Sequence, residues 1–263
     1  MPNKVRFAIH GGGYIAKIHA QAVADTAGAE LVALAGRSGS ASELAKLASV
    51  PWLDGEEGLV AAAKRGEFDV AILCTPNTMH APVGLRLLDA GVHLLVEKPM
   101  TTSFADATAL ADRARANKLH AATAHMWRVD QEATWLRDQI ATGAIGAVYR
   151  SRGCGVHTGW GPSGWFTEAK LAGGGAVADM GIQRSTHCDS SSASRRRLPS
   201  RLVPRAASSA AMLRIRRASA STGRAEPGQR LRPAGGSRSQ MALSRACAST
   251  VNAAPPPSSP PPW

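Results

Sequence analysis

The sequence has little of what marks a secreted, membrane-spanning or metal-binding protein. Its four cysteines show neither the CxxC spacing of a metal site nor a disulfide framework. The start, Met1 to Val5, lacks the apolar run of a signal peptide. No stretch approaches the roughly 18 consecutive apolar residues of a transmembrane helix. These absences predict a cytoplasmic soluble protein with no membrane partner and no bound metal.

The last 81 residues also lack lysine and, apart from Trp263, aromatic side chains. They hold 14 Arg against 2 acidic residues, which accounts for the whole net charge of +12, whereas residues 1–182 balance 17 basic against 17 acidic side chains. With 16 Ser and 10 Pro, residues 183–263 cannot bury enough apolar surface to offset chain entropy. We expect a globular part, 1–182, with no nucleic-acid partner, and a disordered tail, 183–263.

Strand-like and helix-like stretches alternate over residues 1–125. Short apolar runs predict strands at 5–10, 30–36, 68–74, 93–96 and 119–125. Helical stretches lie between them at 17–25, 42–48, 56–65, a stretch ending at Ala90, and 103–117, with residues 51–53 as a connection. This alternation predicts an α/β fold, a doubly wound parallel sheet of the Rossmann type.

A glycine-rich turn follows the first predicted strand and opens a helix. Gly11, Gly13 and Ala16 form a G-x-G-x-x-A pattern, in which the first glycine permits the turn, the second allows close approach of a pyrophosphate, and the alanine allows close packing. Free N–H groups at the helix start then face the phosphates. We therefore predict a dinucleotide site, which includes Tyr14 and Ile15, over a purely structural turn.

The second predicted strand ends without the acidic residue that binds the ribose in many NAD sites. Gly36 stands there, followed by Arg37 and Ser38. A missing carboxylate removes repulsion of a 2′-phosphate, and the Arg37 guanidinium offers it a planar fork of donors. We predict NADP as the preferred cofactor and NAD as the second choice; a solvated loop arginine is the alternative.

Polar residues follow two more predicted strands, at the sheet edge where ligands bind. Thr75, Pro76 and Asn77 leave the strand 68–74, and His80 opens the next helix. We place all four near the cofactor, although a histidine at a helix start is more often a cap or a packing residue.

Glu97 and Lys98 end the short apolar strand 93–96 and precede Pro99. A lysine at the end of a buried strand is costly unless it has a partner or a task. Lys98 is therefore the first candidate for catalysis, with a solvated lysine as the alternative.

The sequence pattern of residues 126–182 predicts the start of a second α/β domain. The pattern indicates an amphipathic helix at 131–142 ended by Gly143, a strand at 147–156, and a loop rich in Gly and Trp at 158–171. A Gly173–Gly175 loop then enters a helix that has no continuation beyond Ile182. Without the rest of its sheet, the strand 147–156 would keep an unpaired edge, which favours aggregation.

In combination, these pieces resemble the glucose–fructose oxidoreductase/inositol dehydrogenase/MocA family. The matching motifs are Gly11-x-Gly13-x-Ile15-Ala16 with His19, Thr75-Pro76-Asn77 with His80, Glu97-Lys98-Pro99, Arg128, and Gly173-Gly174-Gly175 leading to Asp179-Met180-Gly181. The resemblance implies a Rossmann domain followed by a substrate domain on an open-faced sheet. It also implies homo-oligomers that oxidise or reduce sugars, cyclitols and related polyols with NAD or NADP.

By this resemblance, Lys98 lies beside the nicotinamide and the reacting hydroxyl, Asp179 supports it, and Glu97 and Arg128 belong to the cofactor site. In many dehydrogenases of the family, a histidine follows the aspartate by four residues; here that position holds Gln183. An imidazole exchanges protons near neutral pH and an amide does not. A dinucleotide-binding but catalytically inactive fragment is therefore an alternative to an active enzyme.

The family pattern stops in mid-motif, and a shifted reading frame is our hypothesis for this. Loss of the third base of a His codon before a G yields Gln, and the neighbouring frame allows His-Ala-Val-Asp-Ala-Leu-Arg-Phe-Leu-Leu-Gly-Glu-Pro, which resembles the family's continuation. Residues 183–263 would then replace most of the substrate domain. The alternative is a genuine basic arm for nucleic acid, which we rank lower because the tail lacks Lys, Gly-Arg repeats and interleaved aromatics.

Overall fold

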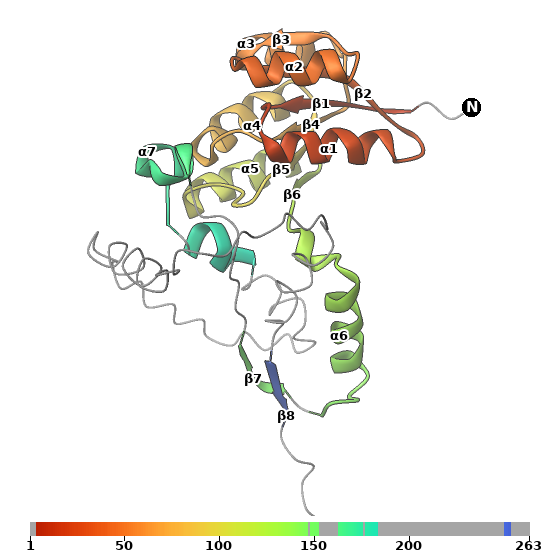
Figure 1. The fold of residues 1–263 in the computed structure, drawn as a ribbon, viewed down its shortest axis with the longest axis vertical. Helices are drawn as coiled ribbons and strands as arrows, with labels where there is room; N and C mark the ends of the chain where they lie inside the picture. Colours follow the sequence, from red (N-terminus) through yellow and green to blue (C-terminus); the bar gives the residue numbers. More distant parts are fainter. Residues whose placement is uncertain (1–3, 147, 153–162, 176, 184–249, 254–263) are drawn as a thin grey trace, which may run out of the picture.

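A computed structural model describes residues 4–146, 148–152, 163–175, 177–183 and 250–253 (Figure 1). The Rossmann elements fill the upper half of Figure 1, and α6 (Gln131–Ala141), β7 (Val148–Arg152) and β8 (Thr250–Ala253) extend below them. Among the described helices, none is both long and apolar enough to cross a membrane.

A six-stranded parallel sheet forms the first part of the chain. Its strands are ordered β3-β2-β1-β4-β5-β6, the order of a doubly wound dinucleotide-binding sheet, which confirms the predicted fold class. The strands are β1 (Val5–His10), β2 (Ala29–Gly36), β3 (Trp52–Asp54), β4 (Val70–Leu73), β5 (His93–Val96) and β6 (Ala121–Thr123). The order reverses between β1 and β4, so the carboxyl ends of these two strands flank the crevice where ligands bind in such sheets.

Helices cover both faces of this sheet because its central strands are apolar on both sides. The helices are α1 (Tyr14–Ala24), α2 (Gly39–Leu47), α3 (Gly55–Lys64), α4 (His80–Asp89) and α5 (Phe104–Ala116). Ala8 and Leu73 pack into the core beneath α3, α4 and α5, while their neighbours Ile9 and Ile72 pack beneath α1 and α2. The Ser103 hydroxyl oxygen accepts a hydrogen bond from the Asp106 N–H at 3.1 Å, which confirms it as the cap of α5.

The second part of the described chain is smaller and less regular. It contains the 3₁₀ turn η2 (Met126–Arg128), α6 (Gln131–Ala141), β7 (Val148–Arg152), η3 (Gly164–Thr167), α7 (Ala169–Ala172), the π-helical turn η4 (Val177–Gly181) and β8 (Thr250–Ala253). Gly143 follows α6 with φ +76°, as a helix-ending glycine does. The helix expected after Gly175 thus begins with this π-helical turn and continues through Gln183, the last described residue of its segment.

The strand β7 pairs antiparallel with β8, a pairing that no local pattern predicted. In this two-stranded sheet each strand still has one edge without a strand partner among the described residues. The strand β8 is a short described segment of the stretch 183–263, and its β-branched Thr250 and Val251 favour an extended chain. Residues 153–156 of the expected strand, and 184–249 and 254–263 of the tail, lie outside the described residues.

Candidate cofactor and catalytic site

The turn after β1 requires glycine for a steric reason. Gly11 has φ +120°, and a Cβ placed there would lie 2.6 Å from the carbonyl oxygen of Cys74 at the end of β4. The Gly11 N–H donates to the Ala35 carbonyl at 2.9 Å, which closes the turn against β2. The structure thus supports the tight-turn reading of the first motif glycine.

The start of α1 is open to an anion. Gly13 occupies the N-cap position, no side chain caps the helix, and its first turn contains no acidic residue. A Cβ at Gly13 would meet nothing within 4 Å, so there is open space beside this turn. Tyr14 is 81% exposed and Ala16 is fully buried against the sheet. The residues present therefore fit the pyrophosphate of a dinucleotide.

Gly12 is a site residue that motif reasoning missed. A Cβ at this position would lie 2.2 Å from the backbone nitrogen of Ala41, in the first turn of α2. The glycine loop therefore packs directly on the helix that follows Arg37 and Ser38. The run of three glycines was the available signal, since the dinucleotide motif itself requires only Gly11 and Gly13.

Arg37 and Ser38 lie together where β2 ends. The Arg37 side chain is exposed and makes no hydrogen bond or ion pair with the described residues. It passes over Gly55 (φ +59°), where a Cβ would lie 2.8 Å from Arg37 Nε. The Ser38 and Ser40 hydroxyls are 2.9 Å apart at the start of α2. An exposed guanidinium thus lies over the start of α3, where its charge adds to the hydrogen bond from Arg86 in lowering the pKa of Glu57, and two hydroxyls lie at the start of α2.

The loop after β4 holds Thr75, Pro76 and Asn77, and the first and last are buried. The Asn77 side-chain N–H donates to the Ala172 carbonyl at 2.8 Å, so this amide fastens α7 to the Rossmann domain. The Thr75 hydroxyl is buried without a hydrogen-bond partner among the described residues. Asn77 therefore has a structural contact in addition to its predicted cofactor role.

His80 lies behind this loop and is fully buried. Its Nδ1 is 3.0 Å from the Pro99 carbonyl and its Nε2 is 3.0 Å from the Thr75 carbonyl. Burial lowers its pKa, and the two carbonyls partly offset this. A neutral ring can donate to only one of the carbonyls. His80 thus connects the loops after β4 and β5, which matches the packing alternative given above.

Lys98 has the partner that its position requires. Its Nζ lies 2.5 Å from Asp179 Oδ1 and 3.3 Å from the Asp179 carbonyl oxygen, and both side chains are largely buried, at 19% and 25% exposure. The lysine comes from the exit of β5 and the aspartate from η4, so only the fold brings them together. Of the candidate residues, these two form the closest charged pair.

Glu97 connects the same loop to α1. Its Oε1 accepts a hydrogen bond from His19 Nε2 on α1 at 2.9 Å, and its Oε2 accepts from the Lys98 backbone N–H at 3.0 Å. His19 was part of the family resemblance without a role of its own. Its position six residues after Gly13 places it on the cofactor helix, but the contact with Glu97 is visible only in the fold.

Gln183 occupies the position of the expected histidine and is 5% exposed. Its Oε1 has no hydrogen-bond partner among the described residues. His125 lies at the exit of β6, where burial and then the charge of Arg128 lower its pKa. Arg128, which is exposed, therefore lies close to His125.

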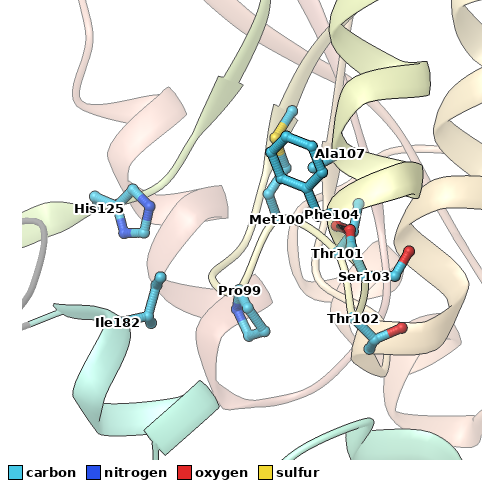
Figure 2. Close-up of a pocket in the computed structure, with 9 residues that line it drawn as sticks. All are labelled: Pro99, Met100, Thr101, Thr102, Ser103, Phe104, Ala107, His125 and Ile182. Atoms are coloured by element: carbon cyan, nitrogen blue, oxygen red, sulfur yellow. Dashed lines mark hydrogen bonds between the residues drawn. The ribbon is translucent and has the colours of Figure 1, made fainter. Parts of the chain in front are cut away.

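A shallow groove of about 310 Å³ adjoins Lys98 on the side of α5 (Figure 2). In Figure 2, His125 and Ile182 face the opposite wall, which is formed by the loop after Pro99 and by Phe104. Its lining residues are 99–104, Ala107, His125 and Ile182.

Residues 5–125 match the family model GFO_IDH_MocA, described as an oxidoreductase family with an NAD-binding Rossmann fold. Residues 5–125 therefore belong to the Gfo/Idh/MocA family as its NAD-binding Rossmann domain. The D-glucoside 3-dehydrogenase of Escherichia coli (strain K12) is 35% identical over 190 residues, which cover 68% of this chain and 51% of that relative. The inositol 2-dehydrogenase of Rhizobium meliloti (strain 1021) is 36% identical over 96 residues, covering 36% and 28%.

Solved structures of this family share the fold. GenD2 from gentamicin A biosynthesis, in complex with NAD, has a TM-score of 0.68 at 23% identity and covers 73% of this chain and 54% of its own. A levoglucosan dehydrogenase in complex with NADH and levoglucosan has a TM-score of 0.64 at 22% identity, with 72% and 54% covered. This chain therefore spans about half the length of the D-glucoside 3-dehydrogenase and of these two structures.

Proposed function

We propose that the chain binds a nicotinamide dinucleotide, with NADP(H) preferred, at the carboxyl edge of the Rossmann sheet. We further propose that this site belongs to an oxidoreductase acting on a hydroxyl or carbonyl of a sugar, cyclitol or related polyol. The contact of Lys98 with Asp179 carries the proposal, because it places a supported ammonium group on the strand next to β4, near the glycine loop. The sugar and inositol dehydrogenases among the relatives support the substrate class.

In the proposed reaction each of these groups has a separate role. When bound, the nicotinamide supplies or accepts the hydride. The Lys98 ammonium donates a hydrogen bond to the substrate oxygen and exchanges a proton with it as the carbinol and carbonyl forms interconvert. The Asp179 carboxylate holds Nζ in place by accepting its hydrogen bond. The open start of α1 binds the phosphates, and no side chain competes with them there.

Arg37 leads to a direct test of cofactor choice. Titration of protein fluorescence with NADPH and NADH is expected to give tighter binding of NADPH, because the free guanidinium pairs with the 2′-phosphate. Arg37→Ala is expected to weaken NADPH roughly tenfold and to leave NADH nearly unchanged, since one charge-assisted contact is worth about 1.5 kcal/mol or more. Arg115→Ala, on the exposed surface of α5, is the matched control. Tighter NADH binding by the unaltered chain would refute the preference.

A dinucleotide-binding but inactive fragment is the second candidate function. The amide of Gln183 in place of a histidine and the half-length match favour it. A turnover assay with a panel of sugars and inositols separates the two candidates, and we expect binding with little or no turnover. Turnover at rates typical of dehydrogenases would exclude the inactive fragment, whereas failure to bind either dinucleotide would exclude both candidates.

A further inference from the structure

The carboxylate of Glu97 lies between the cofactor helix and the candidate catalytic lysine. Each oxygen has one donor: Oε1 receives His19 Nε2–H at 2.9 Å and Oε2 receives the Lys98 N–H at 3.0 Å. A carboxylate only accepts, so the proton of this contact belongs to His19. Both side chains are mostly buried, with 16% and 13% exposure, which restricts their alternative conformations.

The charge of Glu97 affects titratable groups at the exits of neighbouring strands. Burial raises the pKa of the Cys74 thiol, and Glu97 raises it further. Burial lowers the pKa of His80 and of His125, and in both cases Glu97 acts in the opposite direction. Glu97 is therefore close to the exits of β4 and β6 as well as to its own strand.

A second carboxylate lies beside Lys98 in the chain. Asp179 Oδ1 lies 2.5 Å from Lys98 Nζ, and Glu97 is the preceding residue, whose Oε2 accepts a hydrogen bond from the Lys98 backbone N–H. With limited solvent, a Glu97 carboxylate that lost its donor from His19 would become an alternative partner for the Lys98 ammonium. The hydrogen bond from His19 keeps Oε1 turned toward α1.

We propose that His19 is a positioning residue: through Glu97 it keeps Lys98 paired with Asp179. The inference rests on the role of Lys98 proposed above. Because His19 belongs to α1, whose N-terminus faces the phosphates, this contact also connects the cofactor helix with the proposed proton-exchanging group. Loss of the His19 donor frees Glu97 to take over Lys98, which withdraws the ammonium from the substrate oxygen.

Zero-length cross-linking of the full chain with a carbodiimide shows directly whether Lys98 contacts Asp179 or Glu97. The reagent activates a carboxylate, the contacting lysine amine attacks it, and an amide forms with release of a urea. In the unaltered chain we expect a Lys98–Asp179 amide, detected by mass spectrometry as a bond between tryptic peptides 87–113 and 171–184. A Glu97–Lys98 amide instead leaves peptide 87–113 alone, lighter by one water.

Variants at His19 separate the hydrogen bond from the volume of the ring. His19→Phe keeps a ring without a donor, and its ratio of Lys98–Asp179 to Glu97–Lys98 product is expected to fall roughly fivefold or more. His19→Gln keeps a donor and is expected to retain the original ratio. Adding Glu97→Gln to His19→Phe removes the competing carboxylate and is expected to restore the Lys98–Asp179 product. Should His19→Phe fail to fold, His19→Ala serves with the same expectation.

His93→Ala is the matched control, since His93 starts β5 at the opposite edge of the sheet and stacks on His120. Its product ratio should equal that of the unaltered chain. The proposal is overturned by an unchanged ratio in His19→Phe, by a similar change in His19→Gln or His93→Ala, or by absence of the Lys98–Asp179 product from the unaltered chain. Titration of the same variants with NADPH tests cofactor binding separately, because the cross-link requires neither cofactor nor turnover.

Discussion

Buried histidines lie directly beneath the strand exits that form the site. His10, the last residue of β1, is 2% exposed, and its Nδ1 has no hydrogen-bond partner among the described residues. Burial, reinforced by the nearby His80, lowers the pKa of His10 to about 4. The fold therefore accommodates His10 only as the neutral ring, and acid opposes folding at this point.

This pKa leads to a pH dependence of stability. In the unfolded chain His10 binds a proton below its ordinary pKa of 6.5, whereas in the folded chain it does so only near 4. The neutral His10 ring is therefore worth of order 3 kcal/mol of folding stability relative to the protonated ring. This stability is complete above pH 6.5 and is lost as the pH falls from 6.5 toward 4. Urea unfolding at pH 7 and pH 4.5 measures the loss.

His10→Asn removes the titrating group, so its free energy of unfolding is expected to fall less between these two pH values than that of the unaltered chain. His120→Asn, at an exposed position, is the control and should follow the unaltered chain. An equal loss in His10→Asn would show that His10 is not the group responsible.

At the level of elements, the cofactor site depends on close packing between the glycine loop that precedes α1 and the first turn of α2. Gly12 packs on the backbone of Ala41 in α2, whereas the position next to it, Gly13, opens into free space. Neighbouring glycines thus serve different purposes: one permits packing between helices, and the other leaves room for the phosphates.

Two alanine substitutions test this division. Gly12→Ala places a methyl group 2.2 Å from a backbone atom that cannot move aside by itself, so we expect a lower melting temperature together with loss of NADPH binding. At Gly13 φ is −73° and a Cβ would have no neighbour within 4 Å, so we expect Gly13→Ala to leave the melting temperature unchanged. Its methyl group would occupy space proposed for the phosphates, so we expect weaker NADPH binding. Thermal melts and fluorescence titrations measure both quantities. Equal melting temperatures for the two variants would contradict the division.

The elements themselves were largely predictable from the sequence because period and turn chemistry are local. The strand 5–10 and the cap Ser103 were located from neighbouring residues alone. The strand β3 was missed since three residues, Trp52–Asp54, carry no periodicity, and it forms by pairing with Leu34–Gly36. The pairing of β7 with β8 was missed for a related reason: the two strands lie about a hundred residues apart.

At the level of the whole molecule, the described hydrophobic core lies within the Rossmann domain. Both buried clusters and their flanking apolar residues fall between Phe7 and Ala121. The D-glucoside 3-dehydrogenase matches 68% of the chain, close to the share that precedes Gln183. That a shifted frame replaced most of a substrate domain after Ile182 stays our hypothesis.

The nucleotide sequence around codon 183 tests that hypothesis. We expect that restoring one base will turn Gln183 into histidine and extend the reading frame through a complete substrate domain. The corrected chain is then expected to oxidise a sugar or polyol that the present chain does not. A verified frame that ends in the present tail, together with tryptic peptides from 184–263 in cells, would contradict it.

Local sequence was sufficient for the glycine loop, the parallel sheet and the candidacy of Lys98, because each depends on neighbouring residues and on the general rule that ligands bind where parallel strands end. The partners of those residues came only from the fold. Asp179 at Lys98, His19 at Glu97 and Ala172 at Asn77 are each brought from a distant part of the chain. Hydrogen bonds and ion pairs require atoms within about 3 Å, and such proximity between distant residues is a property of packing that periodicity does not encode.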